Sequence, residues 1–296
     1  MDIAAALSSG KKACSFEFFP PKTEAGVEAL LETVRLLRPL SPLFVSVTYG
    51  AAGSSRGRTI ELAKRIKHEL DIEVLVHVTC VGSAVDELRR LFDELATAGI
   101  ENILALRGDA PEGLGVFTRA DGGLRYASEL VALLAREYRF CIGAACYPEV
   151  HVEAVSAFDD LKNLRAKVEA GAQFLITQLF FENSVYLDFV ARARAAGITV
   201  PIIPGIMPIT DYGQVARFTK MCGSTIPPIL REELEYRADD KQSIIDLGVA
   251  YATLQCSDLL VQGAPALHFY TLNRSPATRA IVSALLSAGR LMRSPY

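Results

Sequence analysis

The sequence predicts one (β/α)8 barrel, a TIM barrel, over residues 1–296, with an extra helical insertion before the eighth strand. Eight short apolar runs alternate with longer segments that have helical periodicity. The runs are apolar nearly throughout, as expected for parallel strands that are covered on both faces. No linker rich in Pro, Gly or Ser divides the chain, which predicts a single domain. A doubly wound open sheet is the alternative, although eight βα units are more than that fold usually needs.

The expected strands are β-rich apolar runs that end at residues unsuited to a sheet. They are Cys14–Phe19, Leu43–Tyr49, Val74–Cys80, Asn102–Arg107, Cys141–Tyr147, Phe174–Phe180, Val200–Ile206 and Leu267–Leu272. The first run ends at Pro20-Pro21, because proline cannot donate a hydrogen bond to a neighbouring strand. Gly99, Gly171 and Gly197 each precede a later strand, where a glycine commonly ends the helix before it.

The expected helices fill the segments between these strands. They are Glu24–Leu37, Arg56–Leu70, Ala84–Ala98, Tyr126–Tyr138, Asp159–Ala170, Ser184–Ala196, Asp211–Met221 and Ser275–Ser287. The segment Pro227–Gln262 does not fit the repeat, because it holds a Pro-Pro step, a charged stretch and a long helix-like run from Gln242. We therefore expect this segment to be an additional helical insertion before the last strand.

Charge and cysteine pattern exclude several classes of function. A net charge of −3 argues against nucleic-acid binding, which needs clustered Lys and Arg. We expect no membrane span, because Pro201, Pro204 and Pro208 interrupt the best apolar candidate. The N-terminus lacks the basic start and the apolar run of a signal peptide, and the six cysteines show no zinc or redox spacing. These features predict a cytoplasmic protein with buried free thiols.

Glu17 is the most informative polar residue, since it interrupts the apolar run Phe16–Phe19 close to the end of the first strand. Burying an unpaired carboxylate is costly, so this position needs a partner or a function. An apolar site disfavours the ionised form, and we therefore expect a raised pKa and a group that donates a proton near neutral pH. The structural alternative is a Glu at the rim of the sheet that a neighbouring Lys or Arg neutralises.

Other unusual polar residues also fall near the ends of strands. In a (β/α)8 barrel, the active site lies where the carboxyl ends of the strands meet. These residues are Thr48, His77, Arg107-Gly108-Asp109, Tyr147, His151, Gln178, Tyr270 and Arg274. We expect them to form one site, although each has a structural alternative, such as a satisfied core histidine at His77.

Two local patterns are weaker signals. The glycine-rich stretch 110–123 could bind phosphate, but it has neither a G-x-G-x-x-G nor a Walker pattern. Glu149, His151 and Glu153 alternate along the chain as metal ligands can. A metal site would usually include more His or Cys, and the chain has only four His, so we predict no metal.

Taken in chain order, the motifs resemble those of the methylenetetrahydrofolate reductase family. The matching stretches are Phe16–Pro21, Val45–Ala51, Arg107–Asp109, Tyr126–Ser128, Tyr147–His151, Ile176–Gln178 and His268–Arg274. Because all of these matches follow the family order from one end of the chain to the other, together they are far more specific than any one of them.

The resemblance implies a barrel that binds FAD non-covalently. It implies that NADH or NADPH reduces the flavin, which then reduces methylenetetrahydrofolate to 5-methyltetrahydrofolate in a ping-pong cycle. Glu17 matches the general acid that helps to open the five-membered ring of the folate, and the resulting iminium cation accepts hydride. Asp109 matches a carboxylate near both flavin and pterin, which would hold the pterin and tune the flavin. A cofactor is required in any case, because no side chain carries hydride.

The resemblance also implies the remaining contacts. The folate contacts would be Glu17, Asp109, Gln178, Gln214, Phe218, Tyr270 and Arg274, and a guanidinium at Arg274 suits the carboxylates of the glutamate tail. The flavin contacts would be Thr48, His77, Arg107, Gly108, Asp109, Tyr126, Ala127, Tyr147, His151, Asp160, Asn163 and Lys167. Two positions depart from the family pattern. Val152 replaces a proline, and Ala166 replaces a basic residue whose contact Arg165 could supply.

Several expectations concern the protein as a whole. The chain ends soon after the barrel, so we expect neither the regulatory domain of eukaryotic relatives nor inhibition by S-adenosylmethionine. We expect a homo-oligomer, because the exposed helices of such barrels often pair, and the choice between NADH and NADPH stays open. The alternatives are a flavin-free aldolase or pterin synthase, which would want a Lys at a strand end, and a barrel that only binds a ligand.

Overall fold

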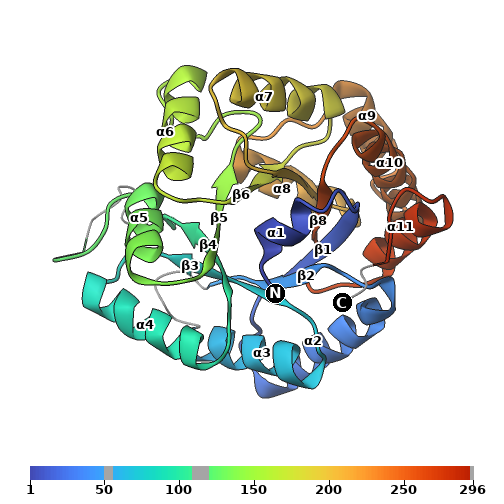
Figure 1. The fold of residues 1–296 in the computed structure, drawn as a ribbon. Coiled ribbons are helices and arrows are strands. Elements are labelled where there is room, and N and C mark those ends of the chain that lie inside the picture. The colour runs from blue at the N-terminus through green and yellow to red at the C-terminus, as the bar shows by residue number, and fades with distance from the viewer. Residues whose placement is uncertain (50–55, 109–119, 294–296) are drawn as a thin grey trace.

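The computed structural model describes residues 1–49, 56–108 and 120–293, and its centre is a closed barrel of eight parallel strands (Figure 1). The strands are β1 (Ala13–Phe18), β2 (Phe44–Val47), β3 (Val74–Thr79), β4 (Asn102–Leu106), β5 (Cys141–Cys146), β6 (Phe174–Leu179), β7 (Ile202–Ile206) and β8 (Ala266–Tyr270). All eight predicted strands are confirmed. The doubly wound alternative is wrong, because β1 pairs with both β2 and β8 and closes the sheet.

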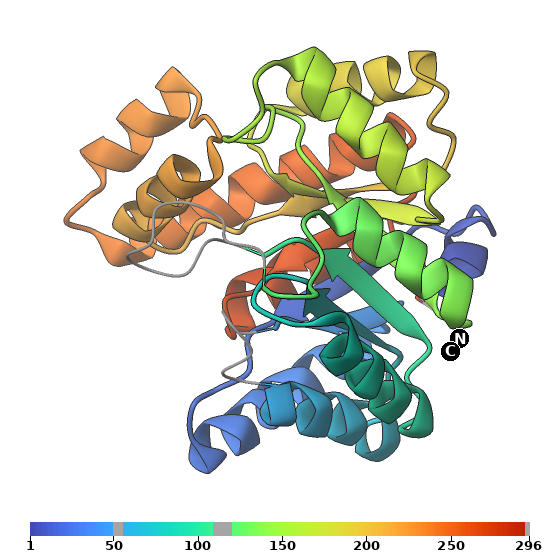
Figure 2. The same cartoon turned by 90° about the vertical axis from the view of Figure 1, so that its left-hand side faces the viewer.

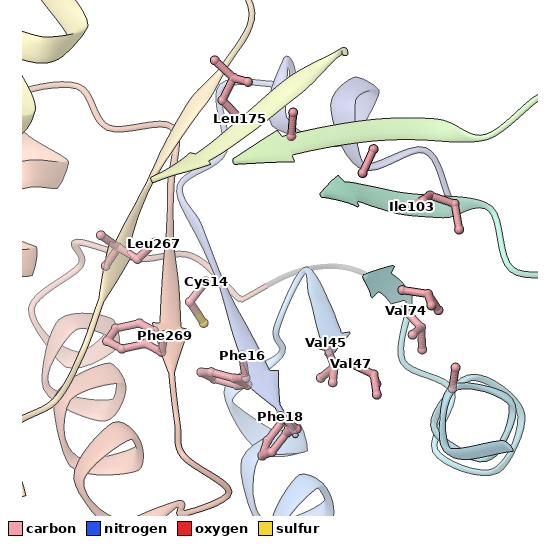
Figure 3. Close-up of a cluster of buried hydrophobic side chains, with 14 of the residues drawn as sticks. Cys14, Phe16, Phe18, Val45, Val47, Val74, Ile103, Leu175, Leu267 and Phe269 are labelled. Atoms are coloured by element: carbon pink, nitrogen blue, oxygen red, sulfur yellow. The ribbon is translucent and has the colours of Figure 1, made fainter. Parts of the chain in front are cut away.

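Helices surround the barrel, as predicted. The outer ring in Figure 1 contains α2 (Glu24–Leu37), α3 (Arg56–Glu69), α4 (Val85–Thr97), α5 (Ala127–Glu137), α6 (Ala157–Glu169), α7 (Asn183–Ala195), α10 (Lys241–Val261) and α11 (Pro276–Ser287). A short 3-10 helix, η1 (Arg38–Leu40), follows α2. Between strands and helices lies the main hydrophobic core, to which Cys14, Phe16 and Phe18 of β1 contribute (Figure 3). Because side chains alternate along a strand, Ser15 and Glu17 point to the inside of the barrel.

The amino end of the barrel is closed by a helix that the sequence did not predict, α1 (Ile3–Leu7). Ile3 and Leu7 are buried against residues of the barrel interior, including Phe44 and Phe174. The backbone N–H of Ile3 donates to Asn102 Oδ1 at 3.1 Å, and Figure 1 shows α1 inside the ring of helices. The interior is therefore reached from the carboxyl end of the strands.

The predicted extra helices before β8 are confirmed, and they have two different positions. α8 (Tyr212–Cys222) and α9 (Pro228–Tyr236) project beyond the carboxyl end, in orange in Figure 2, and share a small core with Leu179 and Met207. α10 instead packs Cys256, Leu259 and Leu260 into the main core. By length and composition α10 could span a membrane, but this burial against the barrel explains its apolar character.

Candidate active site

Two adjoining cavities open at the carboxyl ends of the strands. The central cavity, of about 380 Å³, contains most of the predicted strand-end residues: Glu17, Thr48, His77, Arg107, Gly108, Tyr147, His151, Gln178, Phe218 and Tyr270. The side cavity, of about 750 Å³, lies toward α5 and α6 and is lined by Arg107, Tyr126, Ala127, Tyr147, His151, Asp160, Asn163 and Lys167. Arg107, Tyr147 and His151 line both, so the two cavities form one continuous site.

Three predicted or candidate residues lie elsewhere, and a fourth is not described by the structure. Gln214, on the projecting helix α8, and the exposed Arg274 are not among the described residues that line either cavity. Asp109 lies outside the described residues. Arg165, the candidate replacement for a basic contact, forms an ion pair with Glu169 on the surface of α6 at 2.7 Å. The basic residue of α6 that lines the side cavity together with Lys167 is Lys162, not Arg165.

Glu17 is buried, with 6% of its surface exposed, and two histidines contact its carboxylate. Its Oε2 lies 3.3 Å from His268 Nε2 and 3.5 Å from His77 Nε2. The structural alternative, neutralisation by a neighbouring Lys or Arg at the rim, is therefore wrong. Glu17 lies at the floor of the central cavity with imidazoles as its partners.

The expected raised pKa of Glu17 is wrong in direction. Burial does raise the pKa of the carboxyl, but the hydrogen bond with His268 and the electrostatic interactions with the His77 and His268 imidazoles outweigh it, so the pKa lies below its usual range. Burial lowers the pKa of His77 to about 4, so this imidazole is neutral near neutral pH.

The end of β1 is held by the segment that follows β8. Thr271 donates through Oγ1 to the carbonyl oxygen of Glu17 at 2.6 Å. The side chain of Asn273 makes two hydrogen bonds of 2.8 Å to the backbone of Phe19, accepting from its N–H and donating to its carbonyl. Leu272 and Asn273 have φ of 51° and 59°, a left-handed bend that turns the chain back over β1. This arrangement sets the backbone position of Glu17.

Strands β6 and β8 form the opposite wall of the central cavity. Tyr270 donates its hydroxyl to the carbonyl of Thr177 at 2.6 Å, and burial raises the pKa of this hydroxyl well above its usual value. Gln178 accepts from the N–H of Leu179 at 2.9 Å through Oε1. Both side chains line the cavity, with a neutral phenol and an amide that can hydrogen-bond a polar heterocycle.

The side cavity is lined by charges of both signs, with Arg107, Arg125, Lys162 and Lys167 beside Glu153, Asp159 and Asp160. Lys167 donates to the carbonyl of Ala145 at 2.6 Å, and burial lowers the pKa of its ammonium. The amino end of α5 begins at this cavity, and its N-cap residue Tyr126 makes no side-chain capping hydrogen bond. At the mouth, Arg107 holds Glu153 through two hydrogen bonds of 2.5 and 2.7 Å. An amino helix end with nearby cations suits a phosphate group.

The alternating Glu149, His151 and Glu153 do not converge on one point. Glu149 accepts from the N–H of Thr225, Glu153 pairs with Arg107, and His151 Nδ1 accepts from the N–H of Glu153. In the part of the chain that the structure describes, no group of three or more metal-ligating side chains comes together.

Sequence reasoning missed the individual roles of Ser15, His268 and Glu153. Ser15 and His268 are two residues from Glu17 and Tyr270, on the same two strands. Because side chains alternate along a strand, that spacing places Ser15 beside Glu17 and His268 beside Tyr270 inside the barrel. This two-residue spacing could have been read from the sequence. The pairing of Glu153 with Arg107 could not, because it depends on the conformation of the loop after β5.

Comparisons with known proteins identify the family of this chain. The family model described as methylenetetrahydrofolate reductase matches residues 2–286. The 5,10-methylenetetrahydrofolate reductase of Escherichia coli (strain K12) is 42% identical over 271 residues, which cover 92% of this chain and 90% of that protein. Methylenetetrahydrofolate reductase (NADH) 1 of Arabidopsis thaliana is 36% identical over 99% of this chain. The chain spans about half, 51%, of the length of this plant relative.

A solved structure supports the fold. A protein from Clostridium thermocellum, described as binding two copies of 5-methyl-5,6,7,8-tetrahydrofolic acid, superposes with a TM-score of 0.67. The comparison covers 98% of this chain and 99% of that one, at 18% sequence identity. The family model, the long bacterial alignment and the strand-end site lead to one conclusion: the chain belongs to the methylenetetrahydrofolate reductase family.

Proposed function

We propose that the protein reduces 5,10-methylenetetrahydrofolate to 5-methyltetrahydrofolate, with NADH or NADPH as the reductant and FAD as the hydride carrier. The observation that carries this proposal is the buried Glu17 at the floor of a cavity that continues into a second cavity, where Lys167 and the amino end of α5 lie. The first suits a polar heterocycle and the second suits a nucleotide with phosphates. The proposal also rests on the bacterial relative, whose name states this activity and which the chain matches over nearly its whole length.

The described residues fit FAD. His77 Nε2 is buried and makes no hydrogen bond to the described part of the chain, so a ligand in the central cavity can satisfy it. Lys167 and the amino end of α5 would hold the pyrophosphate, while Asp160 and Asn163 would accept or donate at its edge. When bound, the flavin supplies the hydride that no side chain can carry.

The side chains of the central cavity would perform the remaining chemistry. Glu17 would deliver a proton to the ring nitrogen of the folate that leaves as the five-membered ring opens. Gln178 and Tyr270 would orient the pterin from the opposite wall. Because α1 packs against the amino end of the barrel, folate and water would reach Glu17 from the carboxyl end, where the described residues open the central cavity. Arg274, exposed beyond β8, would meet the carboxylates of the glutamate tail.

The cofactor is tested first. We expect the purified protein to absorb at about 450 nm, as oxidised flavins do, and to release FAD on denaturation. A folded protein that is colourless and takes up no FAD in a titration would contradict the proposal. It would favour instead the flavin-free enzyme or the barrel that only binds a ligand.

The Glu17→Gln variant tests the acid. We expect reduction of the flavin by NADH or NADPH to stay close to the wild-type rate, while reoxidation by methylenetetrahydrofolate slows about 10²- to 10⁴-fold. Anaerobic stopped-flow absorbance measures the two half-reactions separately. Equal slowing of both would mean that Glu17 only supports the structure.

Two further properties are proposals. The six cysteines are all free, in agreement with a reducing compartment such as the cytoplasm. A homo-oligomer would give a mass above 32.1 kDa in light scattering, and a single-chain mass would contradict it.

A further inference from the structure

The turn after β5 has a backbone conformation that its sequence disfavours. Val150 has φ of 73°, in the left-handed region, which a β-branched residue rarely adopts. Such a conformation persists only where the surrounding structure holds it. Three hydrogen bonds do so: Val150 N–H donates to the carbonyl of Tyr147 at 3.2 Å, His151 N–H to Asp160 Oδ2 at 3.3 Å, and Arg192 Nη2 to the carbonyl of Pro148 at 3.3 Å. The turn 147–151 is therefore fixed to α6 and α7.

This turn places two aromatic rings where the two cavities meet. Tyr147 and His151 are its first and last residues, and both line the central and the side cavity. Their rings meet edge to face, with centroids 4.5 Å apart. Because the turn is fixed to two helices of the outer ring, these two rings form a fixed part of the cavity wall.

Glu149, in the middle of this turn, directs its carboxylate to a different element. None of the three hydrogen bonds above involves that carboxylate. Both of its oxygens lie 3.0 Å from the backbone nitrogen of Thr225, whose N–H donates to them. Thr225 belongs to the linker 223–227 between α8 and α9. A second contact lies beside this one: a Cβ added at Gly223 would come within 2.7 Å of Val152 Cγ1, so the two segments approach this closely only because Gly223 has no side chain.

The linker directly continues a helix that forms part of the central cavity. Phe218 and Cys222 lie on the last turns of α8, and both line that cavity. α8 and α9 project beyond the carboxyl end of the barrel, in orange in Figure 2. Ser224 Oγ gives the linker another attachment, since it donates to the carbonyl of Leu179 at the end of β6 at 2.7 Å. The position of Phe218 in the cavity wall therefore depends on how the linker is attached to the barrel.

We propose that Glu149 is a positioning residue for folate binding, because its carboxylate fastens the linker, and with it Phe218 of α8, to the fixed turn after β5. The proposal rests on the function proposed above. Phe218 then stays at a constant distance from Tyr147 and His151 in the wall of the central cavity. When the carboxylate is lost, the turn keeps its three other hydrogen bonds, so the contacts of FAD with the turn should remain. α8, in contrast, loses one of its attachments to the barrel, so the folate should bind more weakly.

The affinity for methylenetetrahydrofolate tests this assignment. Anaerobic stopped-flow reoxidation of the dithionite-reduced flavin, measured over a range of methylenetetrahydrofolate concentrations, gives a dissociation constant and a limiting rate. We expect Glu149→Ala to raise that dissociation constant roughly 3- to 10-fold, as the ordinary net contribution of one hydrogen bond implies. The limiting rate and the dissociation constant of FAD should stay close to the wild-type values. An unchanged folate affinity, or an FAD affinity that falls as much as the folate affinity, would overturn the proposal.

Two further variants are the controls. Glu149→Gln keeps a side-chain oxygen that can accept from the N–H of Thr225, so it should restore most of the folate affinity. Asp258→Ala removes a different carboxylate, which accepts from Asn183 Nδ2 at 2.7 Å and joins α7 to α10. Asp258 is not among the described residues that line either cavity, so its loss should leave the folate affinity unchanged. The proposal fails if Glu149→Gln binds folate as weakly as Glu149→Ala, or if Asp258→Ala weakens folate binding to the same extent.

Hydrogen exchange of the purified protein, followed by mass spectrometry, tests the attachment of α8 without the folate. Peptides from 212–236, which cover α8 and α9, should exchange faster in Glu149→Ala than in the wild type, because local opening becomes easier. Peptides from the turn 147–151 should exchange at the wild-type rate. Equal exchange of 212–236 in the two proteins would overturn the proposal. If methylenetetrahydrofolate does not reoxidise the wild-type flavin, the proposed function fails, while the exchange measurement still decides whether Glu149 holds α8 in place.

Discussion

Acidification should destabilise the protein through His77, whose imidazole is buried against Glu17. Its pKa falls from the 6.5 of an ordinary histidine to about 4, with burial as the main cause. One pKa unit corresponds to ~1.4 kcal/mol, so folding disfavours the imidazolium by about 3 kcal/mol. Because the folded pKa is the lower one, the unfolded chain binds more protons between these pH values. Stability is therefore complete above the unfolded pKa and is lost as the pH falls toward the folded one.

Urea unfolding near pH 7 and near pH 5 measures this loss. Between these two pH values, the free energy of unfolding of the wild type should fall by about 2 kcal/mol because of His77. The loss is smaller than the full value of about 3 kcal/mol, because the interval covers only part of the range between the unfolded and the folded pKa. The His77→Gln variant cannot take up this proton, so its free energy of unfolding should fall by about 2 kcal/mol less than that of the wild type. His68→Gln is the control, because His68 is exposed at the end of α3 and should behave like the wild type. An equal loss in wild type and His77→Gln would refute the reasoning.

Three further predictions concern the site. Lys167→Met should weaken FAD binding roughly 10- to 100-fold, because a hydrogen bond from a charged group contributes about 1.5–3 kcal/mol. Fluorescence titration of the apoprotein with FAD measures the affinity, and an unchanged affinity would contradict the prediction. Gly108→Ala should cost about 1–3 kcal/mol in a thermal melt, since Gly108 has φ of 91° and a methyl group there would clash with Val81. Asp109→Asn should weaken folate binding and make the flavin easier to reduce, because a negative charge near the flavin opposes added electron density. A redox titration with an unshifted potential, together with an unaltered folate dissociation constant, would remove Asp109 from the site.

Local patterns in the sequence predicted the barrel and the place of the site. The β-rich runs could be recognised because parallel strands buried on both faces are apolar throughout. The Pro-Pro step after Phe19 marked the end of β1, so Glu17 could be placed near the carboxyl end. α1 was missed, because five residues with two buried side chains carry too little periodicity to stand out.

The charge state of the site could not be predicted in the same way. An apolar neighbourhood along the chain suggested that Glu17 would have a raised pKa, since only desolvation is visible in the local sequence. His77 and His268 lie far from Glu17 in sequence and reach its carboxylate because β3 and β8 place them inside the closed barrel. Their contacts reverse the direction of the shift.

The sequence by itself therefore determined which residues form strands and which polar side chains end near the mouth of the barrel. Both depend on periodicity and on residues such as Pro20, whose effects are local. Only the tertiary structure decided which of these side chains meet: Glu17 with His268, and Arg107 with Glu153. The physical reason is that electrostatic interactions and hydrogen bonds depend on distance in space, and closing the barrel brings together residues that are more than two hundred positions apart, such as Ser15 and His268.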